Sequence, residues 1–344
     1  MKKAPTIRDV AATAGVSVSV VSRVLNPDSG PVAPAKREQV LRVIAELGYR
    51  PRAAARELSA GHALTVGLVV ADLANPFFAQ LADRVVWEAR GHGVQVVVMT
   101  TQEDPHLEAE SLDTLLDRSV GGVIATPTGG NVEKWDRLRD LGVNVVFVDR
   151  TIADLADVDV VSIENSDSAQ RATEHLITLG HTRIGIVTGP ASTSTGRSRI
   201  DGYRAAHHNA SIVVDPMLIR DVPFRGDGGG NAVGSLLALP DAPTGLIVAN
   251  TAQVQSSVRR LVQTGVRIPE DLSVIVFDDN PWTELTNPPL TVIRQPIDML
   301  ALHSLELVLG RMQGRLPPGP RTIEVQADFV PRSSCAPLIP SAVR

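Results

Sequence analysis

The stretch TIRDVAATAGVSVSVVSRVLN at residues 6–26 predicts two short helices joined by a tight turn. Thr6 can cap the first helix, and Asp9 lies in its first turn, where a carboxylate interacts favourably with the helix dipole. Gly15 can adopt the positive φ that ends a helix sharply. Ser17 can cap the second helix, whose apolar residues recur at helical spacing and can pack on the first. The pattern therefore predicts a helix-turn-helix unit.

The outward face of the second predicted helix carries groups that can contact DNA. A valine can meet a thymine methyl group, a serine can bond to base edges or a phosphate, and an arginine suits guanine. These side chains are Val18, Ser19, Ser22 and Arg23. An ordinary helical hairpin with a solvated polar face is the alternative interpretation of this segment alone.

Two further helices are predicted before residue 62. Residues 34–48 form an amphipathic pattern, with an apolar face of Val40, Ile44 and Leu47 and with Gly48 as the C-cap. The segment 51–62 predicts a short helix that has little apolar surface and so would fray alone. Its arginines, Arg52 and Arg56, and its Leu58 suit a minor groove, with the leucine inserted between base steps.

These motifs together resemble the lactose-repressor/galactose-repressor (LacI/GalR) family of bacterial transcriptional regulators. The resemblance is carried by Thr6-Ile7-x-Asp9-Val10-Ala11, Ala14-Gly15-Val16-Ser17, Val21-Ser22-Arg23-Val24-Leu25-Asn26 and ELGYRP at 46–51. It implies that the DNA-binding residues are Thr6, Ser17, Val18, Ser19, Ser22, Arg23, Asn26, Tyr49, Arg52, Ala55 and Leu58. Two positions depart from the family pattern. Val20 replaces a usual threonine and Arg52 a small polar residue, so we expect one phosphate contact to be lost and another gained.

Charge is distributed unevenly along the 344 residues, whose net charge is −5. The residues up to His62 carry a net charge of +5 and the rest carries −10, which favours a polyanion as the partner of the N-terminal part. No apolar run approaches the roughly 18–20 residues of a membrane span, and the N-terminus lacks the pattern of a signal peptide. The single Cys335 has no partner for a disulfide or a zinc site. We therefore expect a cytoplasmic protein without membrane contact.

From Leu64 onward, apolar runs alternate with helical patterns. The runs predict strands within 65–72, 94–101, 122–127, 143–150, 158–165, 183–190, 218–222, 245–250 and 272–279. Such alternation predicts parallel sheets with helical crossovers, and its restart after residue 165 predicts two α/β lobes.

Polar residues follow the predicted strands at their C-terminal ends, where open parallel sheets bind ligands. They are Asp72, Thr101, Thr126, Asp149, Thr188, Asn250 and Asp278. Any one of them alone is more typical of an ordinary loop start. Seven in two lobes favour a ligand-binding cleft between the lobes.

The family resemblance implies the same architecture, a periplasmic-binding-protein-like core with a small-molecule effector in its cleft. The effector-binding residues that it implies are Phe77, Phe78, Asp149, Arg199, Asn250 and Asp278. Carboxylates, an amide and a guanidinium can bind vicinal hydroxyls, so a sugar-like effector is the first expectation and a nucleoside or another small polar metabolite the alternative. Thr251 and Glu164 each replace a usual aspartate; either residue at 251 can cap the following helix. Trp282 can cover the cleft mouth or pack on the surface.

We accordingly predict a multidomain protein with an all-α head and an α/β core. Residues 1–50 form the helix-turn-helix domain, 51–62 the hinge helix and linker, and 63–344 the effector-binding and dimerisation core, whose chain crosses between lobes near 163–165 and 290–295. The predicted function is sequence-specific repression on a palindromic site in double-stranded operator DNA. The C-terminal segment has no heptads, so we expect a homodimer without a tetramerising coil.

Three alternatives remain: the same type of regulator without an effector, a solute-binding protein, and a nucleotide-dependent enzyme. The enzyme is disfavoured because GDGGGN at 226–231 lacks the last glycine of a dinucleotide-binding loop and we interpret it as a flexible turn. No GK[ST] loop or GxSxG elbow is present. We expect no catalytic residue, no metal site and no cofactor.

Overall fold

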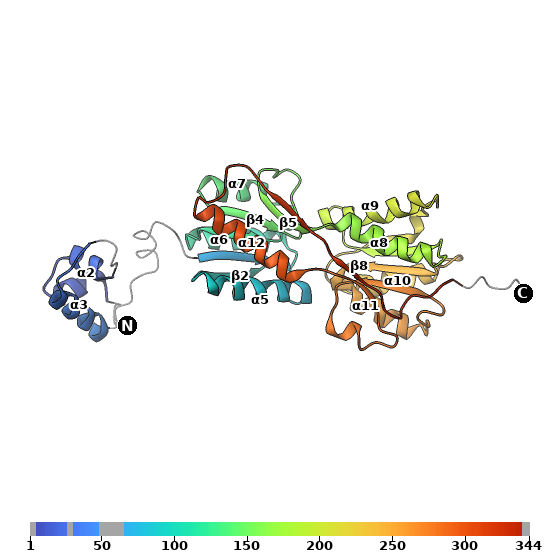
Figure 1. Ribbon diagram of the computed structural model, residues 1–344, viewed down its shortest axis with the longest axis horizontal. Coiled ribbons are helices and arrows are strands. Elements are labelled where there is room, and N and C mark those ends of the chain that lie inside the picture. The colour runs from blue at the N-terminus through green and yellow to red at the C-terminus, as the bar shows by residue number, and fades with distance from the viewer. Residues whose placement is uncertain (1–4, 26–29, 48–64, 339–344) are drawn as a thin grey trace, which may run out of the picture. The chain divides into compact units, whose positions relative to one another are not determined.

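The structure is a computed structural model, and it describes residues 5–25, 30–47 and 65–338. The chain divides into an N-terminal head, which ends at Leu64, and a core, which begins at Thr65 (Figure 1). The predictions made for Asn26, Gly48, Tyr49, Arg52, Ala55, Arg56, Leu58 and the hinge helix lie outside the described residues.

The head contains three described helices around a small apolar core. They are α1 (Ile7–Thr13), α2 (Val18–Leu25) and α3 (Pro34–Leu47). The predicted cap of α1 is present: the Thr6 hydroxyl accepts from the Asp9 N–H at 3.4 Å, and the Asp9 carboxylate accepts from the Thr6 N–H at 2.7 Å. Gly15 has the expected positive φ of 61°. The buried residues are Val10, Ala11, Ala14, Val21, Val24, Val40 and Val43. Ile44 and Leu47, which were expected to face inward, are only partly buried because Val43 takes the inward position.

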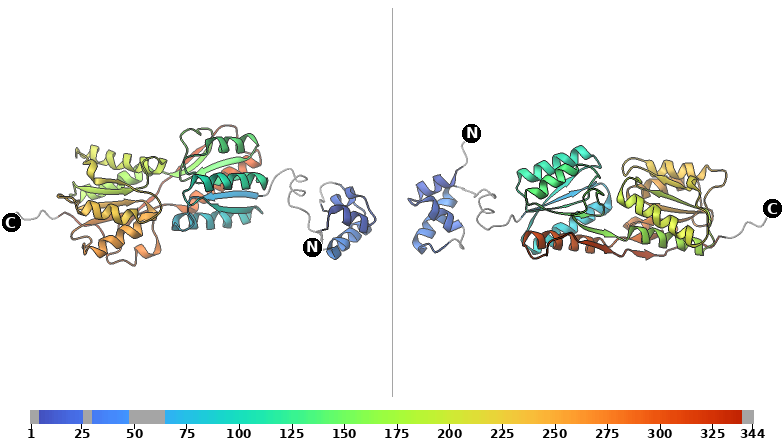
Figure 2. Two further views of the ribbon diagram at one scale, coloured as in Figure 1. Left: turned by 180° about the vertical axis from the view of Figure 1, so that it is seen from behind. Right: turned by 90° about the horizontal axis from the view of Figure 1, so that it is seen from above.

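Lobe 1 of the core has one sheet, in the order β11-β5-β4-β3-β1-β2, and every neighbouring pair is parallel. Its strands are β1 (Thr65–Val70), β2 (Gln95–Thr100), β3 (Gly122–Ala125), β4 (Asn144–Val148), β5 (Asp159–Ile163) and β11 (Thr322–Val325). Its helices are α5 (Pro76–Gly91), α6 (Pro105–Asp117), α7 (Val132–Asp140) and α12 (Ile297–Met312). Figure 2 shows helices on both faces of the sheet.

Successive residues of the lobe 1 strands are buried on opposite faces of the sheet. Ile124 and Val146 pack in one cluster with residues of α5 and α12. Val123 and Phe147 pack in another with Trp135 of α7 and residues of α6. This double burial explains the continuous apolar runs of the sequence, because a parallel strand covered on both faces needs apolar side chains on both.

Lobe 2 repeats the design with the order β12-β10-β9-β8-β6-β7. Its strands are β6 (Ile184–Thr188), β7 (Ile219–Asp221), β8 (Gly245–Ala249), β9 (Ser273–Phe277), β10 (Thr291–Arg294) and β12 (Asp328–Val330). Its helices are α8 (Asn165–Thr178), α9 (Ser194–Asn209), α10 (Gly228–Leu237) and α11 (Thr251–Gln263), with short 3-10 helices at Pro216–Leu218 and Pro281–Thr283. Only β12 is antiparallel to its neighbour among the described strands of this sheet.

The chain passes between the lobes three times. It leaves lobe 1 between β5 and α8, returns between β10 and α12, and leaves again between β11 and β12. The sequence does not predict the third passage. β11 and β12 are short and partly exposed, so they do not form the continuous apolar runs that mark the predicted strands.

The segment 226–231 differs from the expected flexible turn. Residues from Gly228 onward form the first turn of α10. A side chain at Gly229 would place its Cβ 2.6 Å from the Gln253 carbonyl oxygen of α11. The glycines therefore permit close packing of α10 on α11 rather than a loop.

Candidate functional site

The outward face of α2, together with Ser17 just before it, presents residues expected to contact DNA. Val18 is 42% exposed, and Ser17 and Ser19 are exposed with their hydroxyl oxygens 2.8 Å apart. Ser22 and Arg23 are half-buried, and the Arg23 Nε donates to the Ser19 carbonyl oxygen at 3.4 Å. This face thus offers an apolar group, hydroxyls and a cation within two helical turns.

Thr6, a predicted DNA-contact residue, and Val20, where we expect a phosphate contact to be lost, have structural roles within the head. The Thr6 hydroxyl donates to the Asp9 carboxylate at 2.7 Å, so it serves the cap of α1. Val20 is half-buried, which accounts for an apolar residue at this position.

In the core, the ends of β4 and β9 bring two carboxylates to the cleft between the lobes. Asp149 and Asp278 directly follow these strands, have φ of 71° each, and are 8% and 5% exposed. Arg199 of α9 is 5% exposed and interacts electrostatically with both. Its Nε donates to the Asn165 side-chain oxygen at 2.8 Å and its Nη1 to the Ala249 carbonyl oxygen at 3.0 Å. The two aspartates and the arginine thus form a buried charged group at the point where the sheets face each other.

Burial shifts the titration of these three groups. It raises the pKa of Asp278 to about 7, although Arg199 and a hydrogen bond from the Gln295 Nε2 at 2.8 Å favour the carboxylate. It also raises the pKa of Asp149, against the attraction of Arg150 and Arg199. The pKa of Arg199 is lowered by the same loss of hydration.

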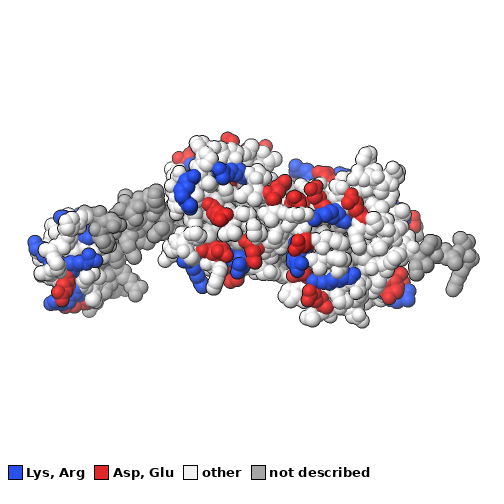
Figure 3. Space-filling model, viewed as in Figure 1, with Lys and Arg blue, Asp and Glu red and all other residues white. Residues whose placement is uncertain are grey.

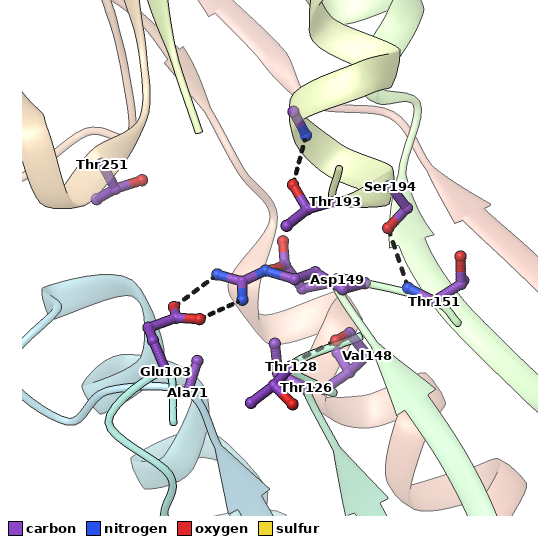
Figure 4. Close-up of polar contacts among 12 residues, drawn as sticks. Ala71, Glu103, Thr126, Thr128, Val148, Asp149, Thr151, Thr193, Ser194 and Thr251 are labelled. Carbon is purple, nitrogen blue, oxygen red and sulfur yellow. Dashed lines mark hydrogen bonds and ion pairs between the residues drawn. The ribbon is translucent and has the colours of Figure 1, made fainter. Parts of the chain in front are cut away.

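A second charged pair lies beside Asp149 and was not predicted. The Arg150 guanidinium donates to both Glu103 carboxylate oxygens at 2.7 and 2.9 Å and is only 4% exposed (Figure 4). The same guanidinium lies 3.9 Å from the ring centroid of Phe224 in lobe 2. On the other side of the cleft the Ser194 hydroxyl accepts from the Thr151 N–H at 3.0 Å, as Figure 4 shows. These contacts join the two lobes directly.

Several polar atoms in the cleft are buried without a hydrogen-bond partner among the described residues. They are the Asn250 Nδ2, the Thr188 Oγ1 and the Gln295 Oε1. Asn250 is 2% exposed and stands before α11 without capping it. Buried polar groups in proteins are nearly always hydrogen-bonded, so these atoms fit a site for a polar molecule.

Four other predicted cleft residues lie in structural positions. Phe77 and Phe78 are 3% and 2% exposed, with their rings packed edge to face at 5.0 Å in the core of lobe 1. The Thr101 hydroxyl donates to the Ala71 carbonyl oxygen at 3.4 Å, and the Thr126 hydroxyl to that of Val148 at 3.1 Å. These hydrogen bonds connect neighbouring strand ends of lobe 1. Phe77 also lines a cavity of about 340 Å³ together with Asp278.

The unusual residues Thr251, Glu164 and Trp282 all lie at the cleft. Thr251 does not cap α11 as expected; it is the first residue of that helix, and its hydroxyl donates to Asp278. Glu164 is half-buried and lines a cavity of about 360 Å³ with Asp149. Trp282 combines both interpretations, because it packs on the lobe 2 core and lines a cavity of about 310 Å³ that residues of both lobes enclose.

No group of three or more His, Cys, Asp and Glu residues within 5–25, 30–47 and 65–338 is arranged to hold a metal ion. None of the helices in those ranges is long and apolar enough to cross a membrane. On the face of the core seen in Figure 3, positive and negative side chains are interspersed.

Two family profiles match the chain in succession: "Bacterial regulatory proteins, lacI family" over residues 6–52, and "Periplasmic binding protein-like domain" over residues 173–335. The HTH-type transcriptional regulator DegA of Bacillus subtilis is 30% identical over 335 residues, which cover 97% of this chain and 98% of DegA.

Solved structures agree with this match. The lac repressor dimer bound to operator and the anti-inducer ONPF is similar with a TM-score of 0.80 and 27% identity, covering 97% of this chain and 100% of that one. The complex of the transcriptional regulator CelR with cellobiose is similar with a TM-score of 0.73 and 31% identity, covering 96% and 99%. With its helix-turn-helix head and two-lobed core, the chain belongs to the LacI family and is a DNA-binding regulator of transcription rather than an enzyme.

Proposed function

We propose that the protein is a cytoplasmic repressor that binds a palindromic operator as a homodimer and responds to a small, sugar-like effector in the cleft between its lobes. The observation that carries the proposal is the set of buried polar groups in the cleft, Asp149, Arg199, Asn250 and Asp278, in a chain whose head exposes a polar face on α2. The head supplies DNA binding, and the cleft supplies its control.

The DNA-binding role rests on the side chains of α2. Val18, Ser19, Ser22 and Arg23 lie on one helix that is supported by α1 and α3. A single helix can contact only a few base pairs, so two heads are needed for a specific site, and a two-fold dimer matches a palindrome. The similar lac repressor structure is a dimer bound to operator.

The effector class rests on the chemistry of the cleft. Asp149 and Asp278 can accept hydrogen bonds from neighbouring hydroxyls, while Asn250 and Arg199 can donate to hydroxyl oxygens. Such alternation of acceptors and donors suits a polyol better than an anion or an apolar compound. The similar regulator CelR was solved with cellobiose, a sugar.

The proposal is tested in two experiments with the full chain. A thermal-shift screen over mono- and disaccharides, with nucleosides as the comparison class, should identify a sugar that raises the melting temperature; at 100 times its Kd the sugar adds about 2.7 kcal/mol to the free energy of unfolding. Selection of bound fragments from random DNA should yield a palindrome whose occupancy changes with that sugar. If nucleosides are the only class that stabilises the chain, the effector is a nucleoside and not a sugar. DNA binding without sequence preference would contradict the proposed repressor function.

A further inference from the structure

The segment Val222–Gly226 of lobe 2 contacts lobe 1 through two consecutive side chains. The Phe224 ring lies under the Arg150 guanidinium, 3.9 Å from its central carbon. The Arg225 Nη1 donates to the Gln102 backbone and side-chain oxygens at 3.2 and 3.0 Å, and its Nε lies 3.4 Å from an oxygen of Asp72. Each lobe 1 partner follows a different strand, namely β1, β2 and β4. Phe224 and Arg225 thus contact residues that follow three different strands of lobe 1.

The segment is fixed to lobe 2, so these contacts pull the lobes together rather than merely positioning a loop. The Val222 N–H donates to the Thr188 carbonyl oxygen at 3.0 Å, which extends the pairing of β7 with β6. The Pro223 carbonyl accepts from the side chain of the buried Gln253 at 2.8 Å. A Cβ at Gly189 would lie 2.3 Å from a Phe224 ring carbon. The ring can therefore pack here only because residue 189 is a glycine.

The lobe 1 partner of Phe224 is also held in place by contacts within its own lobe. Arg150 is held by two hydrogen bonds to Glu103 and is almost fully removed from water. A cation over an aromatic ring is attracted more strongly when it is desolvated, so this stack carries more energy than an exposed one. The Arg225–Asp72 pair is partly exposed and weak by itself, but Arg225 adds hydrogen bonds to Gln102 of the same lobe.

We propose that Phe224 and Arg225 form a latch that biases the two lobes toward the closed arrangement before any effector binds. The latch sets the effector response, because the free energy of closure that it supplies changes the apparent affinity of the effector. A molecule that binds the closed cleft gains affinity, and a molecule that binds the open cleft loses it. The inference concerns the regulation of the proposed effector site and rests on that proposed function.

The test is a distance measurement on the full chain without DNA or effector. Spin labels are attached to cysteines introduced at Glu133 on α7 and Asn231 on α10, which are exposed residues of lobe 1 and lobe 2, in a Cys335→Ser background. The chain with the native latch should give a short, narrow distance distribution. Phe224→Ala and Arg225→Gln should each shift it to longer, broader distances, and the double variant should shift it furthest.

Arg220→Gln is the matched control. Arg220 lies on β7, and its guanidinium donates to the Ser235 hydroxyl, the Met217 carbonyl and the Ile219 carbonyl, all within lobe 2. Its loss should leave the distances unchanged. A distance distribution that is already long and broad in the native chain would contradict the latch. Latch variants with the same distribution as the native chain would contradict it as well.

Operator binding by the same variants separates the latch from the proposed function. If the latch variants show unchanged distances and the chain binds its operator specifically, the latch is contradicted and the proposed repressor function is not. If the latch variants show longer distances but the chain binds no operator, the latch is supported and the proposed repressor function is contradicted. Melting curves of Arg225→Gln, a substitution of a partly exposed side chain, verify that the chain is folded.

Discussion

Asp149 and Asp278 are counterparts in the two lobes, related by position, backbone and environment. Each directly follows a central strand and has a φ of 71°. The Asp149 N–H donates to the Val161 carbonyl at 2.9 Å, and the Asp278 N–H donates to the Ile293 carbonyl at 2.8 Å, each on the neighbouring strand. The repeated backbone geometry directs one carboxylate from each lobe toward Arg199. The lobes therefore place like charges against each other across the cleft.

Because the pKa of Asp278 is raised, we expect the stability of the folded protein to fall as pH rises. Its pKa is about 7 in the folded chain against 3.8 in a model peptide, so between these values the folded state binds more protons than the unfolded state. The free energy of unfolding should then decrease from about pH 4 to pH 7, by on the order of 2–4 kcal/mol. Urea unfolding at pH 5 and pH 8 should show that Asp278→Asn has a smaller pH dependence than the native chain. Equal slopes for both chains would contradict the assignment.

Removal of Arg199 should abolish the effector response. Arg199→Ala leaves the Asn165 side-chain oxygen and the Ala249 carbonyl without a donor, at a cost of about 1–3 kcal/mol in the free energy of unfolding. The thermal shift produced by the sugar found in the screen should disappear, while effector-free operator binding persists. Arg183→Ala is the control, since Arg183 pairs with Asp215 and Asp241 on the surface of lobe 2. A normal shift in Arg199→Ala would place the effector elsewhere.

Removal of Arg23 should weaken operator binding without affecting the core. One base contact contributes about 1–3 kcal/mol, so Arg23→Ala should raise the operator Kd roughly 5- to 150-fold in fluorescence anisotropy at fixed salt. Arg267→Ala removes the same charge from the exposed Arg267–Asp271 pair of the core and should leave the Kd unchanged. Equal effects of both substitutions would mean that net charge, rather than a base contact, determines the affinity.

Close packing of α8 on α9 depends on Gly202. A Cβ at this position would lie 1.9 Å from the Ser166 carbonyl oxygen, a backbone atom that cannot rotate away. Gly202→Ala should therefore lower the free energy of unfolding by about 1–3 kcal/mol. Gly91→Ala, at the end of α5 with no atom within 4 Å of the added Cβ, should be neutral or slightly stabilising. Chemical denaturation of both variants measures the difference, and equal stability would exclude this steric role.

Much of the fold could be predicted because buried strands leave a strong pattern. The nine runs of apolar residues correspond to β1 to β9. The signal is strongest in strands such as β3 and β8, which are buried on both faces and consist of apolar residues, and it is weaker in the edge strands β2 and β7. β10, β11 and β12 were not predicted. TIEV at 322–325 has alternating exposed residues at a sheet edge, and a four-residue segment of that kind is indistinguishable from a loop.

The site was only partly predictable, for a different reason. Polar residues at strand ends indicated Asp149, Asn250 and Asp278, because their positions follow from the strand pattern alone. Phe224 and Glu103 lie in loops whose path depends on tertiary packing, so no local pattern marks them. Arg150 stands beside Asp149 in the sequence, but its burial results from the pairing with Glu103, 47 residues away.

The path of the chain through the lobes affects how the protein can be made. Lobe 1 receives α12 and β11 only after nearly all of lobe 2 has been synthesised. Until then, the sheet face that includes Ile124 and Val146 is covered by α5 but lacks the part of its cover that α12 supplies, and Gly122 lacks Val308, whose side chain would lie 2.3 Å from an added Cβ. A nascent chain that stops near residue 296 thus exposes an apolar sheet, which is a binding surface for chaperones and a site for aggregation. Premature termination late in the gene should therefore yield insoluble fragments instead of a working first lobe.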